Sequence, residues 1–206
     1  MIAWKGGLKK VDEFFGKSGA AGELVMVSDK PDAVWAAKGY SSYLYVKEAK
    51  DFRKKDLLHF DDGSATQVTI ANAHGTLAFT KGEGKDTWAG TANGKTIARF
   101  DQEKVKDMLR ALKGLNAEDF GDGKSLAETG LDKPEGTITV HFKDDAKPAE
   151  LLVGGVSTGT NHWAKRADDD AIYQVTSFTS DWANAETPKF QSTPDAGAPD
   201  GGGKKK

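Results

Sequence analysis

"TQVTIANAHGTLAFT", residues 66–80, alternates apolar with polar residues on both sides of a short turn signal. A period of two is typical of strands that bury one face. The turn signal is Ala73-His74-Gly75, in which glycine permits a tight reversal of the chain. The residues expected to face the core are Val68, Ile70, Leu77 and Phe79. This stretch therefore predicts a β-hairpin.

The chain around this hairpin carries one strong helix signal and several further strand signals. Asp101 is a suitable N-cap, and apolar residues then recur at helical spacing until Gly114. The apolar stripe consists of Val105, Met108, Leu109 and Leu112. Further strands are predicted around Trp88 and over residues 136–142, 149–155 and 170–175. The expected fold class is α+β, a mostly antiparallel sheet with one well-defined amphipathic helix at about 101–114.

The composition narrows the classes of function. The 206 residues have a formal net charge of −2, and only four of the 29 basic residues are arginine, so no nucleic-acid partner is expected. No cysteine is present, which excludes disulfides, thiolate nucleophiles and zinc–thiolate sites. No apolar run approaches the ~20 residues that a membrane-spanning helix needs. The first residues also lack the apolar run of a signal peptide, so the chain carries no targeting signal.

Two segments of the chain resemble each other at a spacing of 138 residues, namely 15–44 and 153–182. The aligned pairs include Gly16 with Gly154, Val25 with Trp163, Val34-Trp35 with Ile172-Tyr173, Tyr40 with Phe178, and Ser42 with Ser180. A hairpin, its polar turn and the loop that follows all agree between the segments. This agreement predicts an internally repeated hairpin unit.

The duplication divides the chain into three predicted regions. Residues 1–52 are interpreted as the C-terminal half of a preceding repeat, so the chain is expected to start inside a longer parent. Their apolar hairpin is expected to pack on the next unit or to pair with a second chain at a sheet edge. Residues 53–186 are predicted to form a complete α+β repeat domain. Residues 187–206 are rich in Pro, Gly and Asp, and a disordered tail is predicted there.

A Gly-Lys-Ser triplet at residues 123–125 raises the question of nucleotide binding. A phosphate-binding loop needs a glycine five residues before Gly123, and that position holds Glu118, whose carboxylate would repel phosphate. The helix that should follow is cut short by Gly130 and Pro134. A second triplet at 16–18 fails in the same way, because valine stands where the first glycine should be. The sequence favours a Gly/Asp turn.

Other site motifs are also unsupported by their spacing. The four histidines (His59, His74, His141 and His162) show no metal-ligand spacing, and surface or edge positions are predicted for them. Asp168-Asp169-Asp170 and Lys143-Asp144-Asp145 do not continue into a calcium loop and are interpreted as turns between strands. Glu103 and Glu118 form no recognisable carboxylate pair. No catalytic, cofactor-binding or metal-binding residue is predicted, no cofactor is expected, and the chain is expected not to be an enzyme.

Five aromatic residues have two interpretations. They are Trp88, Trp163, Tyr173, Phe178 and Trp182. At strand spacing such residues most often fill a core, but they could also line a ligand groove. The exposure of Trp88 and Trp163 separates the two interpretations.

Several ordered segments resemble the family called domain of unknown function 4340. They are "FRKKDLLHFDDGSATQVTI" (52–70), "GKDTWAG" (84–90), "FDQEKVKDMLRALKGLNAEDF" (100–120), "ETGLDKPEGTITVHFKD" (128–144) and "LLVGGVSTGTNHWAKRADDDAIYQV" (151–175). The most distinctive segment is Gly-Leu-Asp-Lys-Pro at 130–134, although Thr129 stands where the family usually has tyrosine. The resemblance covers about 53–186, and residues 1–52 look like the end of a preceding copy.

The resemblance implies a bacterial envelope protein with tandem repeats of this domain, often held by a membrane helix that precedes them. Some relatives resemble auxiliary parts of gliding or ABC-type export systems, and the family brings no catalytic residue to carry over. We therefore expect a non-enzymatic extracytoplasmic interaction or scaffold module with a protein partner in the cell envelope. The alternative is a module that binds polysaccharide or peptidoglycan through aromatic platforms. An enzyme with dispersed acids would need two carboxyl groups that converge in one cleft.

Overall fold

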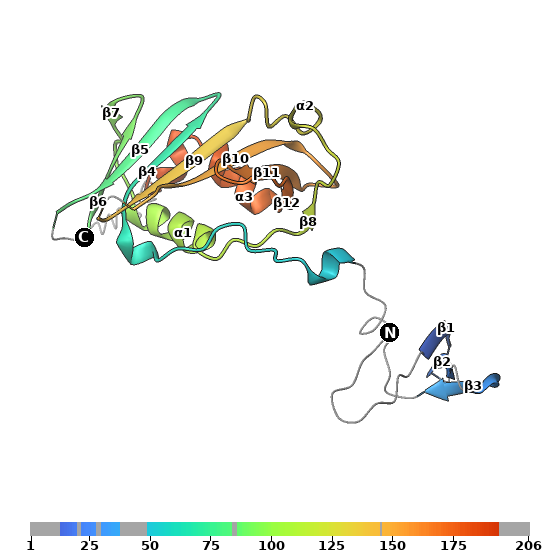
Figure 1. The fold of residues 1–206 in the computed structure, drawn as a ribbon. Coiled ribbons are helices and arrows are strands. Elements are labelled where there is room, and N and C mark those ends of the chain that lie inside the picture. Colours follow the sequence, from blue (N-terminus) through green and yellow to red (C-terminus); the bar gives the residue numbers. More distant parts are fainter. Residues whose placement is uncertain are drawn as a thin grey trace, which may run out of the picture. The chain divides into compact units, whose positions relative to one another are not determined.

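A computed structural model describes residues 13–19, 22–27, 30–37, 49–83, 86–144 and 146–193 (Figure 1). The chain forms two compact units, Met1–Arg53 and Lys54–Lys206. The division falls one residue after the predicted end of the first region at residue 52. The two units are described separately below as unit 1 and unit 2.

Unit 1 contains a three-stranded antiparallel sheet in the order β1-β2-β3. Its elements are β1 (Glu13–Gly19), β2 (Gly22–Val27), β3 (Lys30–Ala37) and the 3₁₀ helix η2 (Ala49–Phe52). The predicted hairpin around Val25 and Val34 is therefore present as β2 and β3. Tyr40 and Ser42 of the predicted alignment lie outside the described residues.

Unit 2 is built on a nine-stranded antiparallel sheet in the order β7-β6-β5-β4-β9-β10-β11-β12-β8 (Figure 1). The strands are β4 (Ala65–Asn72), β5 (Gly75–Lys81), β6 (Trp88–Ala92), β7 (Lys95–Thr96), β8 (Asp119–Phe120), β9 (Gly136–Phe142), β10 (Ala149–Val156), β11 (His162–Arg166) and β12 (Tyr173–Val175). The helices are η3 (Asp62–Ser64), α1 (Gln102–Leu112), α2 (Leu126–Thr129), α3 (Ser177–Ala183) and η4 (Thr187–Phe190). The α+β class with antiparallel pairing is confirmed.

The predicted hairpin is the pair β4–β5. Asn72 pairs with Gly75 at its tip, and the Asn72 side chain accepts a hydrogen bond of 2.9 Å from the His74 backbone N–H. Val68 lies opposite Phe79, so these two side chains share a face of the sheet. Both are fully buried, as the alternating pattern predicts.

One face of the sheet forms the core with α1 and α3, which lie on the same side of it (Figure 1). The α1 stripe of Val105, Met108, Leu109 and Leu112 is buried as predicted. Asp101 is the N-cap of α1, and its side chain accepts a 3.0 Å hydrogen bond from the Glu103 N–H. We call the sheet side packed in this core the covered face; its central residues are Val68, Ile70, Leu77, Phe79, Ile138 and Val140.

The opposite side of the sheet carries mostly small polar residues. Thr69 pairs with Ala78 on β5 and with Thr139 on β9, and Ala78 pairs in turn with Thr91. We call the surface of Thr69, Ala78, Thr91, Thr137 and Thr139 the open face; all five residues are partly exposed. Because side chains alternate along a strand, the same strands build both faces.

The prediction of one well-defined helix was incomplete, because α3 also packs into the core. Trp182 on α3 is buried against Phe190, with ring centroids 6.0 Å apart. The residues of α3 have no apolar stripe as regular as that of α1, which explains why periodicity did not predict it. The four-residue α2 is a single turn.

The folded unit also continues past the predicted boundary at residue 186. Phe190 at the end of η4 is fully buried, and its ring centroid lies 4.4 Å from that of Phe79. The Phe190 carbonyl accepts a 2.9 Å hydrogen bond from the backbone N–H of Asp101. A disordered tail that begins at residue 187 is therefore wrong for residues 187–193. One aromatic anchor within a Pro-containing segment outweighed the polar composition.

Candidate functional site

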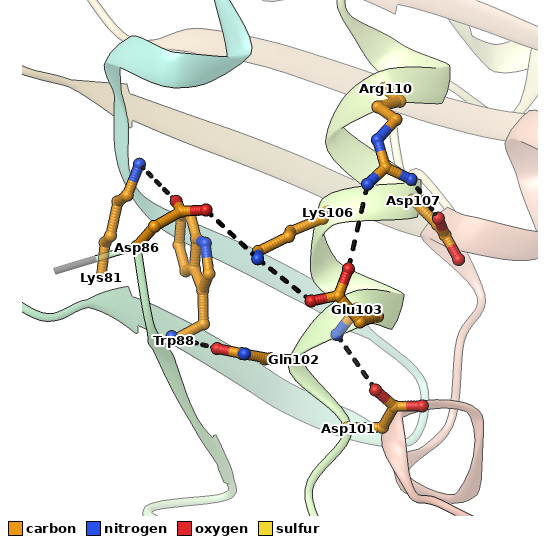
Figure 2. A network of polar contacts seen from close by, with 9 residues as sticks. All are labelled: Lys81, Asp86, Trp88, Asp101, Gln102, Glu103, Lys106, Asp107 and Arg110. Atoms are coloured by element: carbon orange, nitrogen blue, oxygen red, sulfur yellow. Dashed lines mark hydrogen bonds and ion pairs between the residues drawn. The ribbon is translucent and has the colours of Figure 1, made fainter.

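Six charged side chains of alternating sign join the end of β5 to the exposed side of α1 (Figure 2). We call them the ion-pair chain: Lys81, Asp86, Lys106, Glu103, Arg110 and Asp107. Asp86 lies at its centre, because one carboxylate oxygen is 3.1 Å from the Lys81 Nζ and the other is 3.2 Å from the Lys106 Nζ. The segment between β5 and β6 is thereby attached to α1.

The helical part of the ion-pair chain follows from sequence spacing. Glu103 and Lys106 are three residues apart, and their charged atoms lie 3.0 Å apart. Asp107 and Arg110 repeat the same spacing, with a contact of 2.6 Å. Residues three positions apart are neighbours on a helix surface, so these pairs form within α1 itself.

The link between β6 and α1 is reinforced by Trp88 at the start of β6 (Figure 2). Its backbone N–H donates a 3.1 Å hydrogen bond to the side-chain oxygen of Gln102 at the start of α1. The Lys81 Nζ lies 5.9 Å from the Trp88 ring centroid, at the outer limit of a cation–π contact. The Trp88 side chain is buried, so it supports the site from beneath.

The charges in the ion-pair chain stabilise one another. Hydrogen bonds from Lys81 and Lys106 hold the pKa of Asp86 below its ordinary value. Hydrogen bonds to Glu103 and Asp86 raise the pKa of Lys106. Each shift favours the form that the group already has at neutral pH, so neither group is poised to exchange a proton there.

A cleft of about 760 Å³ opens beside Asp86, where β4, β5 and β9 end. We call it the polar cleft; it is lined by Thr66, Gln67, Thr80, Lys81, Gly82, Glu83, Asp86 and Lys143. Gln67 pairs with Thr80 and with His141, so its side chain points to the same side of the sheet as the open face. A smaller cavity of about 220 Å³ shares Lys81 and Asp86 and extends toward α1.

The polar cleft contains groups that could bind a ligand. Within the described part of the chain, the side chains of Gln67, Glu83 and Lys143 have no hydrogen bond or ion pair. The Thr66 hydroxyl donates to the His141 carbonyl over 3.3 Å, which leaves its oxygen as an acceptor. The cleft thus presents an ammonium, a carboxylate, an amide and hydroxyls, a set that suits a polar ligand.

The Gly-Lys-Ser triplet at residues 123–125 is a turn, as predicted. Gly123 has a φ of +75°, and Ser125 is the N-cap of α2. The Ser125 side chain accepts from the Glu128 N–H, while the Glu128 carboxylate accepts from the Ser125 N–H, which is a capping box. Gly130 then ends the helix in the left-handed conformation, so no long helix exists to bind phosphate.

The histidines lie in separate places. His59 and His74 are exposed, and His141 is exposed on β9, as predicted for surface or edge positions. His162 is largely buried, with its Nε2 4.0 Å from a Glu135 carboxylate oxygen. Among the residues that the structure describes, no three His, Asp or Glu side chains lie close enough together to hold a metal ion.

The triple aspartate forms the turn between β11 and β12, as the sequence indicated. Two oxygens of Asp168 accept bonds of 2.8 Å from the Arg166 guanidinium, and one of them also lies 3.1 Å from the Lys147 Nζ. These contacts hold the pKa of Asp168 well below its ordinary value. Asp169 accepts from the Ala171 N–H and from the Tyr173 hydroxyl. Both carboxylates are thus occupied by the turn itself.

The five aromatic residues do not share one environment. Trp88, Tyr173 and Trp182 are buried in the core. Trp163 is partly buried on β11, close to Gly121. Phe178 on α3 is 57% exposed, so the prediction that it fills the core is wrong. Since Trp88 is buried, it offers no aromatic platform to a ligand.

Comparison with protein families matches the family described as Domain of unknown function (DUF4340) over residues 9–134 and 121–193. Together these segments cover most of the chain. The chain belongs to this family. The matched residues also extend beyond the predicted limits of 53 and 186 on both sides. No curated protein and no solved structure matched this domain of unknown function 4340 chain.

Part of the site in this domain of unknown function 4340 chain was accessible to sequence reasoning. The spacing of Glu103 and Lys106 on a predicted helix is a recognisable signal for an ion pair. Asp86 carries no such signal, because its partners come from β5 and α1 and meet it only in the folded unit. In the described residues, no helix is both long and apolar enough to cross a membrane.

Proposed function

We propose that this domain of unknown function 4340 chain is a non-enzymatic interaction or scaffold module that binds a protein partner in the cell envelope. One observation carries the proposal: the nine-stranded sheet has a covered face that holds the core and an open face beside the polar cleft. Thr69, Thr137 and Thr139 supply short, partly exposed side chains across this face. A regular, preformed surface of this kind can receive a partner without rearranging.

The electrostatics support binding over acid–base catalysis. The pKa values of Asp86, Glu128, Asp168 and Asp169 are lowered, chiefly by hydrogen bonds to the charged form. The pKa of Lys106 is raised by its acidic partners. A general acid or base requires the opposite shifts, toward neutral pH.

The location in the envelope rests on the family resemblance. It implies an extracytoplasmic position reached through the parent protein, and a role auxiliary to a gliding or ABC-type export system. Under this proposal the partner contacts the open face, while the covered face maintains the fold.

Site-specific photo-crosslinking tests the proposal. A photoreactive amino acid at Thr139 places the probe on the open face, and one at the exposed Asp181 on α3 serves as the matched control. In envelope fractions of the source organism we expect a discrete protein adduct from Thr139 and none from Asp181. Adducts that form equally at both positions, or only with cytosolic proteins, would contradict the proposal.

A second function, the binding of polysaccharide or peptidoglycan, is favoured by the polar cleft. Its volume of about 760 Å³ lies in the range of ligand sites, and its lining can both donate and accept hydrogen bonds. Because Trp88 is buried, this function would depend on Gln67, Glu83 and Lys143 instead of an aromatic platform. Sedimentation with insoluble peptidoglycan tests it: binding that is lost in Lys143→Ala but kept in the exposed control Lys133→Ala supports this function.

A further inference from the structure

The three strands of unit 1 and three strands of unit 2 have the same pattern of residue pairing. In unit 1, Phe15 on β1 pairs with Val25 on β2. In unit 2, Val153 on β10 pairs with Ala164 on β11. The two first strands correspond at an offset of 138 residues and the two second strands at 139. The predicted alignment of Val25 with Trp163 is therefore wrong by one residue.

The correspondence extends along both hairpins. Glu13↔Val27, Phe14↔Met26, Phe15↔Val25 and Ser18↔Glu23 correspond to Leu151↔Arg166, Leu152↔Lys165, Val153↔Ala164 and Val156↔His162. Glu23↔Ala37, Leu24↔Ala36 and Val25↔Trp35 correspond to His162↔Val175, Trp163↔Gln174 and Ala164↔Tyr173. The third strands thus return to the offset of 138.

An irregularity in the pairing occurs at the same place in both hairpins. The register shifts between Phe15 and Ser18 on β1, and between Val153 and Val156 on β10. These positions also correspond at an offset of 138. A β-bulge bends its strand and ends regular pairing on one side, so its position is a specific feature of a sheet. The shared bulge makes β10 a direct guide to β1.

In unit 2, β10 has a second neighbour, β9, on its other edge. The five β9–β10 pairs run from Ala149↔Val140 to Val153↔Gly136, and all of them lie before the bulge. By the offset of 138, the last three of these β10 positions correspond to Glu13, Phe14 and Phe15 of β1. β9 itself alternates threonine with branched apolar residues over Thr137-Ile138-Thr139-Val140.

We propose that the outer edge of β1 binds an extended segment of another polypeptide, antiparallel and with the alternating pattern of β9. The segment adds a fourth strand to unit 1 and forms backbone hydrogen bonds with Glu13, Phe14 and Phe15, in the register that β9 has on β10. Strand addition of this kind obtains affinity from the main chain and specificity from alternate side chains. The proposal does not depend on the envelope role of unit 2.

The length of β1 distinguishes it from the edges of the large sheet. The edge strands of unit 2, β7 and β8, contain two residues each, which is too short to guide the pairing of another strand. β1 contains seven residues. An edge of that length offers enough successive N–H and C=O groups to select a partner strand.

Amide hydrogen exchange on the full chain tests the proposal. The probe is a synthetic peptide of the β9 sequence GTITVHF, flanked by lysines for solubility. At a peptide concentration about 10 times its Kd, exchange should slow about tenfold at the outward-facing amides among residues 13–15. Exchange in β9 and β10 should not change, since β9 already occupies that position in unit 2.

Two N-methylated peptides provide the matched control. One carries N-methyl groups at Thr137 and Thr139, the other at Ile138 and Val140. Alternate residues of an antiparallel strand bond to the same neighbour, so one peptide should lose binding and the other should retain it. Unchanged exchange at residues 13–15, equal effects of the two methylation patterns, or protection confined to unit 2 would each overturn the proposal.

Discussion

The covered and open faces of the nine-stranded sheet come from the same strands and differ only in which alternate residues they present. Val68 and Ile70 on β4 face the core and are fully buried, whereas Thr69 between them is partly exposed. The covered face also contains the tightest aromatic contacts, such as Phe79 with Phe190. The comparison indicates that the stability of unit 2 comes mainly from one face, which leaves the other free to change without unfolding the protein.

This difference can be tested most strongly at Phe190. We expect Phe190→Ala to lower the free energy of unfolding by about 3–5 kcal/mol, because it removes a fully buried ring and leaves a cavity against Phe79. Urea denaturation followed by tryptophan fluorescence measures the change. Phe178→Ala is the control, since that ring is 57% exposed, and its effect should be clearly smaller. Equal effects would mean that η4 does not anchor the core.

Adding volume to the covered face should have the next largest effect. A Cβ on Gly90 would lie 2.5 Å from the Phe100 ring, which is too close for any contact between carbon atoms. Gly90→Ala should therefore destabilise unit 2 by about 1–3 kcal/mol. Gly114→Ala is the matched control, because a Cβ there meets no atom within 4 Å. A thermal melt in which both variants match the parent would contradict the packing described for β6.

A charged contact outside both faces should matter less and should depend on pH. Asp168→Asn removes the paired contacts with Arg166 and should cost at most about 1 kcal/mol at pH 7. Since folding lowers the pKa of Asp168, its contribution is fully present above its ordinary value of 3.8 and is lost as the pH falls below it. Urea midpoints of parent and variant should therefore differ at pH 7 and converge near pH 2.

Asp170→Asn is the control for this measurement. Asp170 lies in the same turn, is fully exposed and has only a 3.9 Å contact with Lys165. Its substitution should leave the urea midpoint unchanged at both pH values. A difference between parent and Asp168→Asn that persists at pH 2 would show that the effect does not come from the ionised carboxylate.

The open face should give the smallest change in stability. Thr139→Ala should alter the free energy of unfolding by no more than about 0.5 kcal/mol, because the side chain is partly exposed and packs against other small residues. Chemical denaturation provides the measurement, and Ile138→Ala on the covered face of the same strand provides the contrast. A large loss in Thr139→Ala would mean that the open face contributes to the core.

Sequence reasoning succeeded where neighbours along the chain determine the structure. The β4–β5 hairpin, the α1 stripe and the turn at Gly123 each depend on residues only a few positions apart. It was incomplete where distant residues decide. Phe190 is anchored by Phe79, more than a hundred residues earlier, and nothing within the Pro-containing segment around Phe190 indicates that contact.

The candidate site shows the same division. The pair of Glu103 and Lys106 follows from helical spacing, but the central position of Asp86 depends on β5 and α1 meeting at that carboxylate. The polar cleft likewise combines Gln67 of β4 with Lys143 beyond β9, whose proximity results from the pairing of those two strands. Spacing along one segment cannot reveal such a combination.

The sequence by itself determined the fold class, the hairpin and the amphipathic helix, because alternation and helical periodicity are local consequences of backbone geometry. It also determined the family, through motifs that lie in order along the chain. Only the tertiary structure decided which face of the sheet is covered, where Phe190 packs and how Asp86 links β5 to α1. These features depend on contacts between segments far apart in the chain, whose free energy exists only once the whole unit has packed.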